Sequence, residues 1–211
     1  MRSATVLRRL TVHEVRALHS LALWVLRRRD GVRTAAYTAK YTEPQTAMLY
    51  GFVFVAIVET VALAVLIPWP LVHAITLFID VYGVIQLIGF HAACVTRPHV
   101  VEADGSLRVR YGALFDLRIP ADQIVRAGVD RRYPDGSRGT ARDDGTLELA
   151  VGGQTTVTVQ LAAPVTFVRP LGRVGTAHTV RFNADDPRAL VAALRPAPER
   201  TAPSPSPVPP G

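Results

Sequence analysis

Two long apolar runs near the middle of the chain dominate its hydrophobic pattern. They cover residues 48–67 and 71–95, and neither contains a Lys or Arg. A helix rises about 1.5 Å per residue, so each run is long enough to cross a hydrocarbon core of about 30 Å. Between them lies only a Pro-Trp-Pro motif, which predicts a tight turn at one membrane face. The pattern therefore predicts a transmembrane helical hairpin over residues 47–96.

Each apolar run carries one acidic residue near its centre, Glu59 in the first and Asp80 in the second. The Leu, Ile, Val and Phe residues contribute about −4 to −8 kcal/mol per helix to insertion. One central acid costs about 2.5–3.5 kcal/mol, so insertion is favoured for both helices. Counted from the turn, the two acids lie at nearly the same depth. We therefore expect Glu59 and Asp80 to form a hydrogen-bonded pair with at least one member protonated.

Polar residues in the second run recur at helical spacing and define a polar stripe. Its members are His73, Thr76, Asp80, Gly83, Leu87 and His91. Lipid cannot satisfy such groups, so the stripe should face protein. We favour a structural role, in which hydrogen bonds hold the hairpin together or join a homo-oligomer through the second helix. The alternative is an oligomeric intramembrane proton or ion site that uses Glu59 and Asp80.

The segment before the hairpin, residues 1–46, has apolar residues at helical spacing between positions 12 and 25. Its apolar part is too short to span a membrane, which predicts an amphipathic helix. We favour a helix on the inner leaflet, and the alternative is a helix packed on the C-terminal domain. Residues 34–46 predict an irregular polar linker. The candidates for contact with anionic headgroups are Arg27, Arg28, Arg29 and Arg33.

From residue 97 onward the pattern changes to the alternation that is typical of β-strands, which predicts a small β domain over residues 97–195. For the apolar faces of the second and third strands to coincide, Tyr111 must oppose Phe115 and Arg110 must oppose Asp116. The same reasoning joins the fifth and sixth strands as a hairpin through a three-residue turn at residues 152–154. The expected strands are 99–103, 107–111, 115–119, 124–130, 147–151, 157–161 and 179–182.

Two further features complete the predicted β domain. Residues 131–144 are rich in Gly, Asp and Arg, which predicts an exposed loop. The pair Asp186-Pro187 predicts an N-cap and the first turn of a helix. The apolar residues of that helix can close an open end of a barrel; they are Leu190, Val191 and Leu194.

Seven strands followed by one helix, in this order, resemble the pleckstrin-homology (PH) superfold. The stretch VRYGALFDLRIPADQIVRAGV is similar to a segment of bacterial membrane-anchored PH domains in which a Gly is followed by an Ile-Pro pair and then by an Ile. The stretch ADDPRALVAAL resembles the C-terminal end of the domains of that family. The whole layout resembles actinobacterial two-pass integral membrane proteins of unknown function. The resemblance implies an α+β fold, with a transmembrane hairpin followed by a small PH-like β-barrel or sandwich and a C-terminal capping helix. It carries over no catalytic residue.

Phosphoinositide-binding PH domains place basic residues on the first strand and an Arg-x-Arg-like pair on the second. Arg108 and Arg110 match the second feature, which makes them lipid-site candidates. The first strand, residues 99–103, contains no Lys or Arg. We therefore favour the alternative, a solvated strand face with an Arg110–Asp116 pair.

The distribution of charge sets the expected orientation of the hairpin. The net charge of the whole chain is +7, and residues 1–47 carry +6 of it. The positive-inside rule places this segment in the cytoplasm, and two crossings return the C-terminal domain to the same side. Basic residues in that domain are interleaved with acids, so we expect no nucleic acid as a partner. The Arg-rich composition is typical of a GC-rich bacterial genome.

The sequence contains no motif of an active site. A nucleophile elbow, a phosphate loop and a metal-ligand cluster are all missing, and Cys94 is the single cysteine. We expect no catalytic residue, metal or cofactor. The expected protein is a non-enzymatic protein of the bacterial plasma membrane that presents a cytoplasmic PH-like domain to anionic lipids or to an unidentified protein. Residues 196–211 predict a disordered Pro-rich tail.

Overall fold

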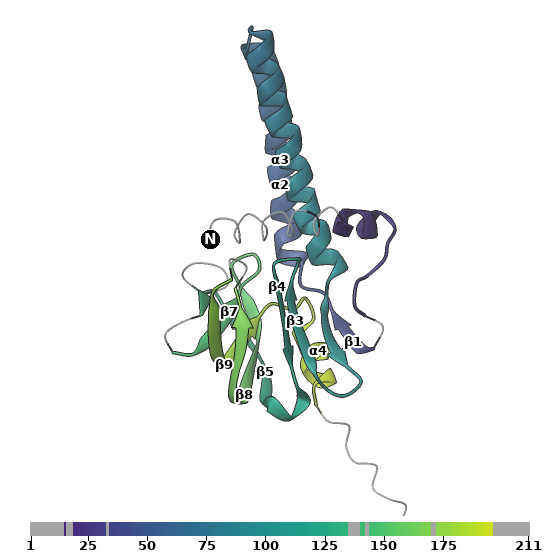
Figure 1. The fold of residues 1–211 in the computed structure, drawn as a ribbon, viewed down its shortest axis with the longest axis vertical. Coiled ribbons are helices and arrows are strands. Elements are labelled where there is room, and N and C mark those ends of the chain that lie inside the picture. Colours follow the sequence, from purple (N-terminus) through teal and green to yellow (C-terminus); the bar gives the residue numbers. More distant parts are fainter. Residues whose placement is uncertain are drawn as a thin grey trace, which may run out of the picture.

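Two long helices form a hairpin that projects from a β domain (Figure 1). The computed structural model describes residues 15, 19–32, 34–134, 140–141, 144–169 and 172–195. Helix α2 spans Glu43–Leu66 and helix α3 spans Pro70–Thr96. Both are long and apolar enough to cross a membrane, and no residue in their most apolar 18-residue windows is buried. The prediction of two long apolar helices joined by a tight turn is confirmed.

Prolines set the ends of both helices. Pro44 stands in the first turn of α2 and Pro70 in the first turn of α3, where the missing N–H costs no helical hydrogen bond. Pro68 prevents α2 from continuing past Ile67, whose N–H still bonds to the carbonyl of Leu63. Helix α2 begins four residues before the expected start of the hairpin.

The first sheet has four antiparallel strands in the order β1-β2-β3-β4. They span Ala35–Ala39, His99–Glu102, Leu107–Tyr111 and Phe115–Ile119. The predicted register between the last two is confirmed, with Tyr111 opposite Phe115 and Arg110 opposite Asp116.

Strand β1 corrects the prediction of an irregular linker over residues 34–46. It pairs with β2, and Ala39 and Tyr37 pack against the core. Tyr41, just beyond the strand, is fully buried. The side chains that alternate along β1 are mostly small, so the apolar signal of this strand was too weak to stand out from the polar residues around it.

The second sheet has five strands in the order β5-β8-β9-β7-β6. They span Ile124–Arg132 (β5), Thr140–Ala141 (β6), Thr146–Leu149 (β7), Thr155–Val168 (β8) and Val174–Phe182 (β9). Strand β5 takes the first two residues of the expected exposed loop at 131–144, and β6 lies near its other end. Within that loop, residues 135–139 and 142–143 lie outside the described residues.

The predicted hairpin between the fifth and sixth strands is wrong. Strands β7 and β8 meet only at the Val151–Gln154 bridge, where Gly152 and Gly153 adopt positive φ values of 59° and 79° in a two-residue turn. Beyond this turn β9 lies between them, antiparallel to β8 and parallel to β7. The alternation of apolar residues fixes which side chains face the core, but it does not fix which strands are neighbours.

The core lies between the two sheets and is closed by helix α4, which spans Pro187–Ala193. The carboxylate of Asp186 accepts a hydrogen bond from the backbone N–H of Ala189 at 3.0 Å, as an N-cap does. Leu190 and Val191 are buried and Leu194 packs against the core, so the predicted capping helix is confirmed. The expected tail at 196–211 lies outside the described residues.

Candidate functional site at the base of the hairpin

A short helical segment, residues 19–25, lies beside the base of the hairpin (Figure 1). It ends at Arg27, which has a positive φ of 54°. The N–H of Arg28 bonds to the carbonyl of Leu23 and the N–H of Arg27 to that of Trp24, the pair of bonds of a Schellman motif. The helix therefore ends just before Arg27.

This segment presents apolar and cationic side chains together. Trp24, Val25 and Leu26 are exposed, and so are Arg27, Arg28 and Arg29. A hollow of about 400 Å³ lies between them and the end of α3; it is lined by Trp24, Val25, Arg27, Arg28, Arg29, Val95 and Thr96. We call these residues the arginine collar. Three of the four predicted headgroup arginines belong to it, and Arg33 lies outside the described residues.

Two arginines of the β domain hold the collar in place. Arg97 donates to Ser20 Oγ at 2.7 Å and to Asp30 Oδ2 at 3.1 Å. Arg110 donates to the carbonyls of Asp30 and Gly31 at 2.8 and 3.3 Å. The N–H of Asp30 also bonds to the carbonyl of Thr96, one of the last carbonyls of α3. The residues that flank the collar arginines in the chain are therefore fixed to both the β domain and the hairpin.

The structure shows how Arg108 and Arg110 are bonded within the protein. Arg108 makes two hydrogen bonds to Asp116, which raise the pKa of its guanidinium. Arg110 is 2% exposed, and burial lowers its pKa. Its Nε atom lies 3.9 Å from Asp116 Oδ2, so the predicted Arg110–Asp116 ion pair is present, although this distance is too long for a hydrogen bond. Arg110 is therefore not on the solvated face that was expected, whereas Arg108 is partly exposed, and the lipid site suggested by the Arg-x-Arg pattern stays a prediction.

The two intramembrane acids do not pair with each other. Asp80 faces α2, where Thr60 Oγ1 donates to its Oδ2 at 3.3 Å. Glu59 is exposed and makes no hydrogen bond to Asp80. Consecutive helical residues point about 100° apart, so when Thr60 faces α3 the side chain of Glu59 cannot do so. One hairpin therefore does not assemble the two-acid site that the proton or ion alternative requires.

The polar stripe of α3 faces protein, as expected, but in two separate places. Its first half lies against α2, where His73, Thr76 and Asp80 line a space of about 10 Å³ with Thr60 and neighbouring apolar residues. At the other end His91 is buried, and its ring meets the edge of Trp24 with centroids 6.3 Å apart. The stripe therefore serves packing within one chain along much of its length.

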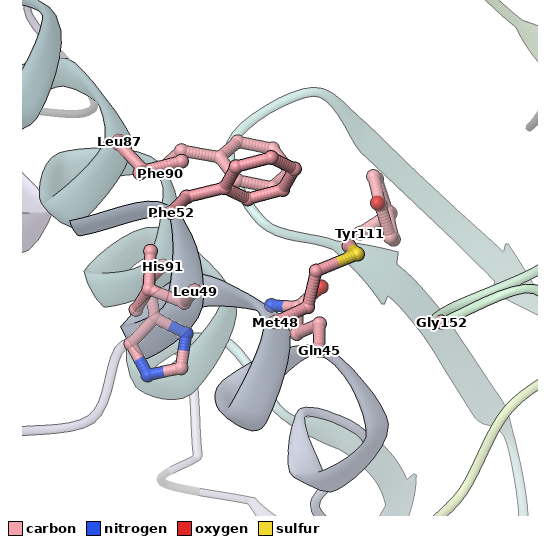
Figure 2. A pocket seen from close by; sticks show the side chains of 9 residues that line it. All are labelled: Gln45, Met48, Leu49, Phe52, Leu87, Phe90, His91, Tyr111 and Gly152. Carbon is pink, nitrogen blue, oxygen red and sulfur yellow. The ribbon is translucent and has the colours of Figure 1, made fainter. Parts of the chain in front are cut away.

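A second cavity, which sequence reasoning missed, lies where the hairpin meets the β domain (Figure 2). It measures about 320 Å³ and is lined by Gln45, Met48, Leu49, Phe52, Leu87, Phe90, His91, Tyr111 and Gly152. The lining comes from both long helices, from the end of β3 and from the turn after β7. No local sequence pattern unites such distant segments, although Leu87 and His91 already belonged to the polar stripe.

A buried polar cluster joins the start of the hairpin to the β domain. His99 Nδ1 accepts from the backbone N–H of Arg110 at 3.0 Å, so its Nε2 donates to the carbonyl of Asn183 at 2.9 Å. Tyr41 stacks on this ring at 4.5 Å, and its hydroxyl accepts from the N–H of Gly112. Burial lowers the pKa of His99 to about 4, so the ring is neutral at pH 7.

The described residues contain no group of three or more His, Cys, Asp or Glu side chains that could hold a metal ion. Cys94 is buried in a small cluster with Tyr41 and Val151, as a core residue would be. Comparison of the chain with protein-family models, with curated proteins and with solved structures found no match. The geometry at the base of the hairpin is therefore the main guide to function.

Proposed function

We propose that this chain is a two-pass protein of the bacterial plasma membrane whose N-terminal segment and β domain lie on the cytoplasmic side. The hairpin supports this proposal, because a core helix of a soluble protein would be buried, whereas the apolar windows of α2 and α3 are not. The hairpin also lies well inside the chain, unlike a signal sequence. Lipid is the environment that suits two such exposed apolar helices.

We further propose that the arginine collar binds the headgroups of anionic lipids. The observation that carries this proposal is its composition: exposed Trp24 and Val25 lie beside Arg27, Arg28 and Arg29 at the point where α3 leaves its apolar stretch. Tryptophan favours the membrane interface, and each arginine near an anionic surface contributes about 1 kcal/mol of attraction.

The β domain then acts as a non-enzymatic module held at the membrane surface, open to a protein partner from the cytoplasm. A PH-like identity is the finer proposal. It is supported by an antiparallel four-stranded sheet, a second sheet packed on the same core and a C-terminal helix that closes that core. The parallel pairing of β7 with β9 departs from the simple succession of hairpins that the resemblance implied.

Quenching of Trp24 fluorescence tests the lipid proposal. The chain has two tryptophans, so Trp69→Phe leaves Trp24 as the single emitter. The protein is reconstituted in vesicles in which either the anionic or the zwitterionic lipid carries brominated acyl chains at equal mole fraction. We expect brominated anionic lipid to quench Trp24 more strongly, because the collar enriches it locally, and added salt should reduce the difference.

Two matched variants separate the effect of the collar on lipid preference from the effect of net charge. Replacing Arg27, Arg28 and Arg29 together by Gln should abolish the preference for anionic lipid. The control replaces three exposed arginines of the β domain by Gln, with the same loss of charge; they are Arg126, Arg131 and Arg188. An unchanged preference in the collar variant, or an equal loss in the control, would show that the collar is not the binding site.

A further inference from the structure

Helix α2 presents a stripe of exposed side chains, whose first two members, Met48 and Phe52, also line the cavity at the base of the hairpin. Its residues recur at alternating spacings of four and three, and all are exposed; they are Met48, Phe52, Val55, Glu59, Ala62 and Leu66. We call these residues the outer stripe. The alternation of four and three is the repeat of a left-handed helix pair. Glu59 is its single ionisable residue and lies near the middle of the helix.

Glu59 is a polar group in need of a partner. It has no hydrogen bond or ion pair within the described residues, whereas Asp80 at a similar depth has Thr60. A carboxyl group that faces hydrocarbon at mid-membrane is costly, and a hydrogen bond between transmembrane helices offsets part of that cost. A partner helix that offers a donor and an acceptor at this depth is therefore favoured over lipid.

The partner that fits without further assumption is a second copy of the same helix. A protonated carboxyl carries one donor and one acceptor, so two glutamic acid side chains complement each other across a two-fold axis. The residues one turn before and after Glu59 on the outer stripe, Val55 and Ala62, are short, which lets two helices approach closely. The second helix is less suited to this contact, because His73, Thr76 and Asp80 already face α2.

We propose that two copies of this chain associate in the membrane through the outer stripe of α2, with Glu59 hydrogen-bonded to the same residue of the second copy. This inference rests on the proposed insertion of the hairpin. It replaces the expected contact through the second helix with a contact through the first.

Disulfide trapping in vesicles tests the geometry. In a Cys94→Ala background, Ala62→Cys lies on the outer stripe, whereas Val61→Cys is equally deep, similarly exposed and more than a quarter turn away from that stripe. Mild oxidation should trap a covalent dimer with Ala62→Cys and little or none with Val61→Cys. Equal trapping at both positions, or none at Ala62→Cys at any protein-to-lipid ratio, would overturn the proposal.

Energy transfer between labelled full-length chains tests the role of Glu59. We expect Glu59→Leu to weaken association about 3- to 30-fold, because it removes both the donor and the acceptor. Glu59→Gln should keep most of it, since an amide retains both functions. Association that is unchanged by Glu59→Leu would overturn the proposal. Resistance to alkaline extraction, measured on the same samples, reports whether the hairpin is inserted and so separates this outcome from a failure of insertion.

Discussion

At the scale of single residues, His99 is the most consequential side chain that the sequence did not single out. It was expected only as the first residue of a strand, yet both ring nitrogens bond to backbone groups and the ring is fully buried. A lone histidine in an apolar strand gives no sign of this, because its partners Arg110 and Asn183 come from distant segments. Its neutral form is needed to keep Nδ1 as an acceptor.

The buried His99 ring predicts a specific dependence of stability on pH. Its pKa is about 4 in the folded protein and near 6.5 in the unfolded chain, so between these values the unfolded chain binds more protons. Stability should therefore be independent of this group above about pH 6.5 and should fall as the pH drops toward 4, by at most about 3 kcal/mol. Denaturation of the detergent-solubilised protein across this range measures the slope.

Substitution by glutamine isolates the contribution of His99 to that slope. The His99→Gln variant cannot take up a proton there, so the difference in unfolding free energy between wild type and variant should itself change by up to about 3 kcal/mol between pH 6.5 and pH 4. A difference that stays constant over this range would mean that the ring is protonated in the folded protein or is not buried as described.

At the scale of elements, the sequence predicted which side chains of a strand face the core better than it predicted which strands are neighbours in a sheet. The register of β3 and β4 followed from alternation alone, because Tyr111 and Phe115 flank a short connection. The insertion of β9 between β7 and β8 did not, since it depends on contacts between segments some thirty residues apart. For the same reason Glu59 and Asp80 were placed at similar depth but not on the correct faces.

The hydrogen bonds that attach the collar to the β domain predict that loss of Arg110 makes the collar more sensitive to protease. Arg110→Gln should loosen residues 19–31, because Arg110 donates to the carbonyls of Asp30 and Gly31. We expect trypsin to cleave at Arg27, Arg28 or Arg29 several-fold faster in this variant, with faster amide exchange over the same residues.

The control for this variant removes an arginine whose partners lie elsewhere. Arg118 pairs with Glu102 and Asp104 at the surface of the first sheet, so Arg118→Gln should leave cleavage at the collar unchanged. Exchange rates in β8 and β9 report whether the domain as a whole remains folded. Equal rates of collar cleavage in wild type and Arg110→Gln would show that Arg110 does not anchor this segment.

At the scale of the whole molecule, one arrangement links the parts. The hairpin projects from the β domain, and the short helix of residues 19–25 lies beside its base, at the level where the helices leave the domain (Figure 1). If the hairpin crosses a bilayer, the arginines of the collar lie at its surface and Glu59 lies within it. Both proposals, binding of anionic headgroups by the collar and pairing of two chains through Glu59, therefore depend on insertion of the hairpin.

The most direct measurement of that placement is the accessibility of engineered cysteines in intact cells. In a Cys94→Ala background, Trp69→Cys lies in the turn between α2 and α3, Lys40→Cys lies before the hairpin and Arg188→Cys lies on α4. A membrane-impermeant maleimide should label Trp69→Cys from outside, and should label Lys40→Cys and Arg188→Cys only after the membrane is opened. Labelling of Lys40→Cys and Arg188→Cys from opposite sides, or a Trp69→Cys variant that is reached only from the cytoplasm, would contradict a hairpin that crosses the membrane twice.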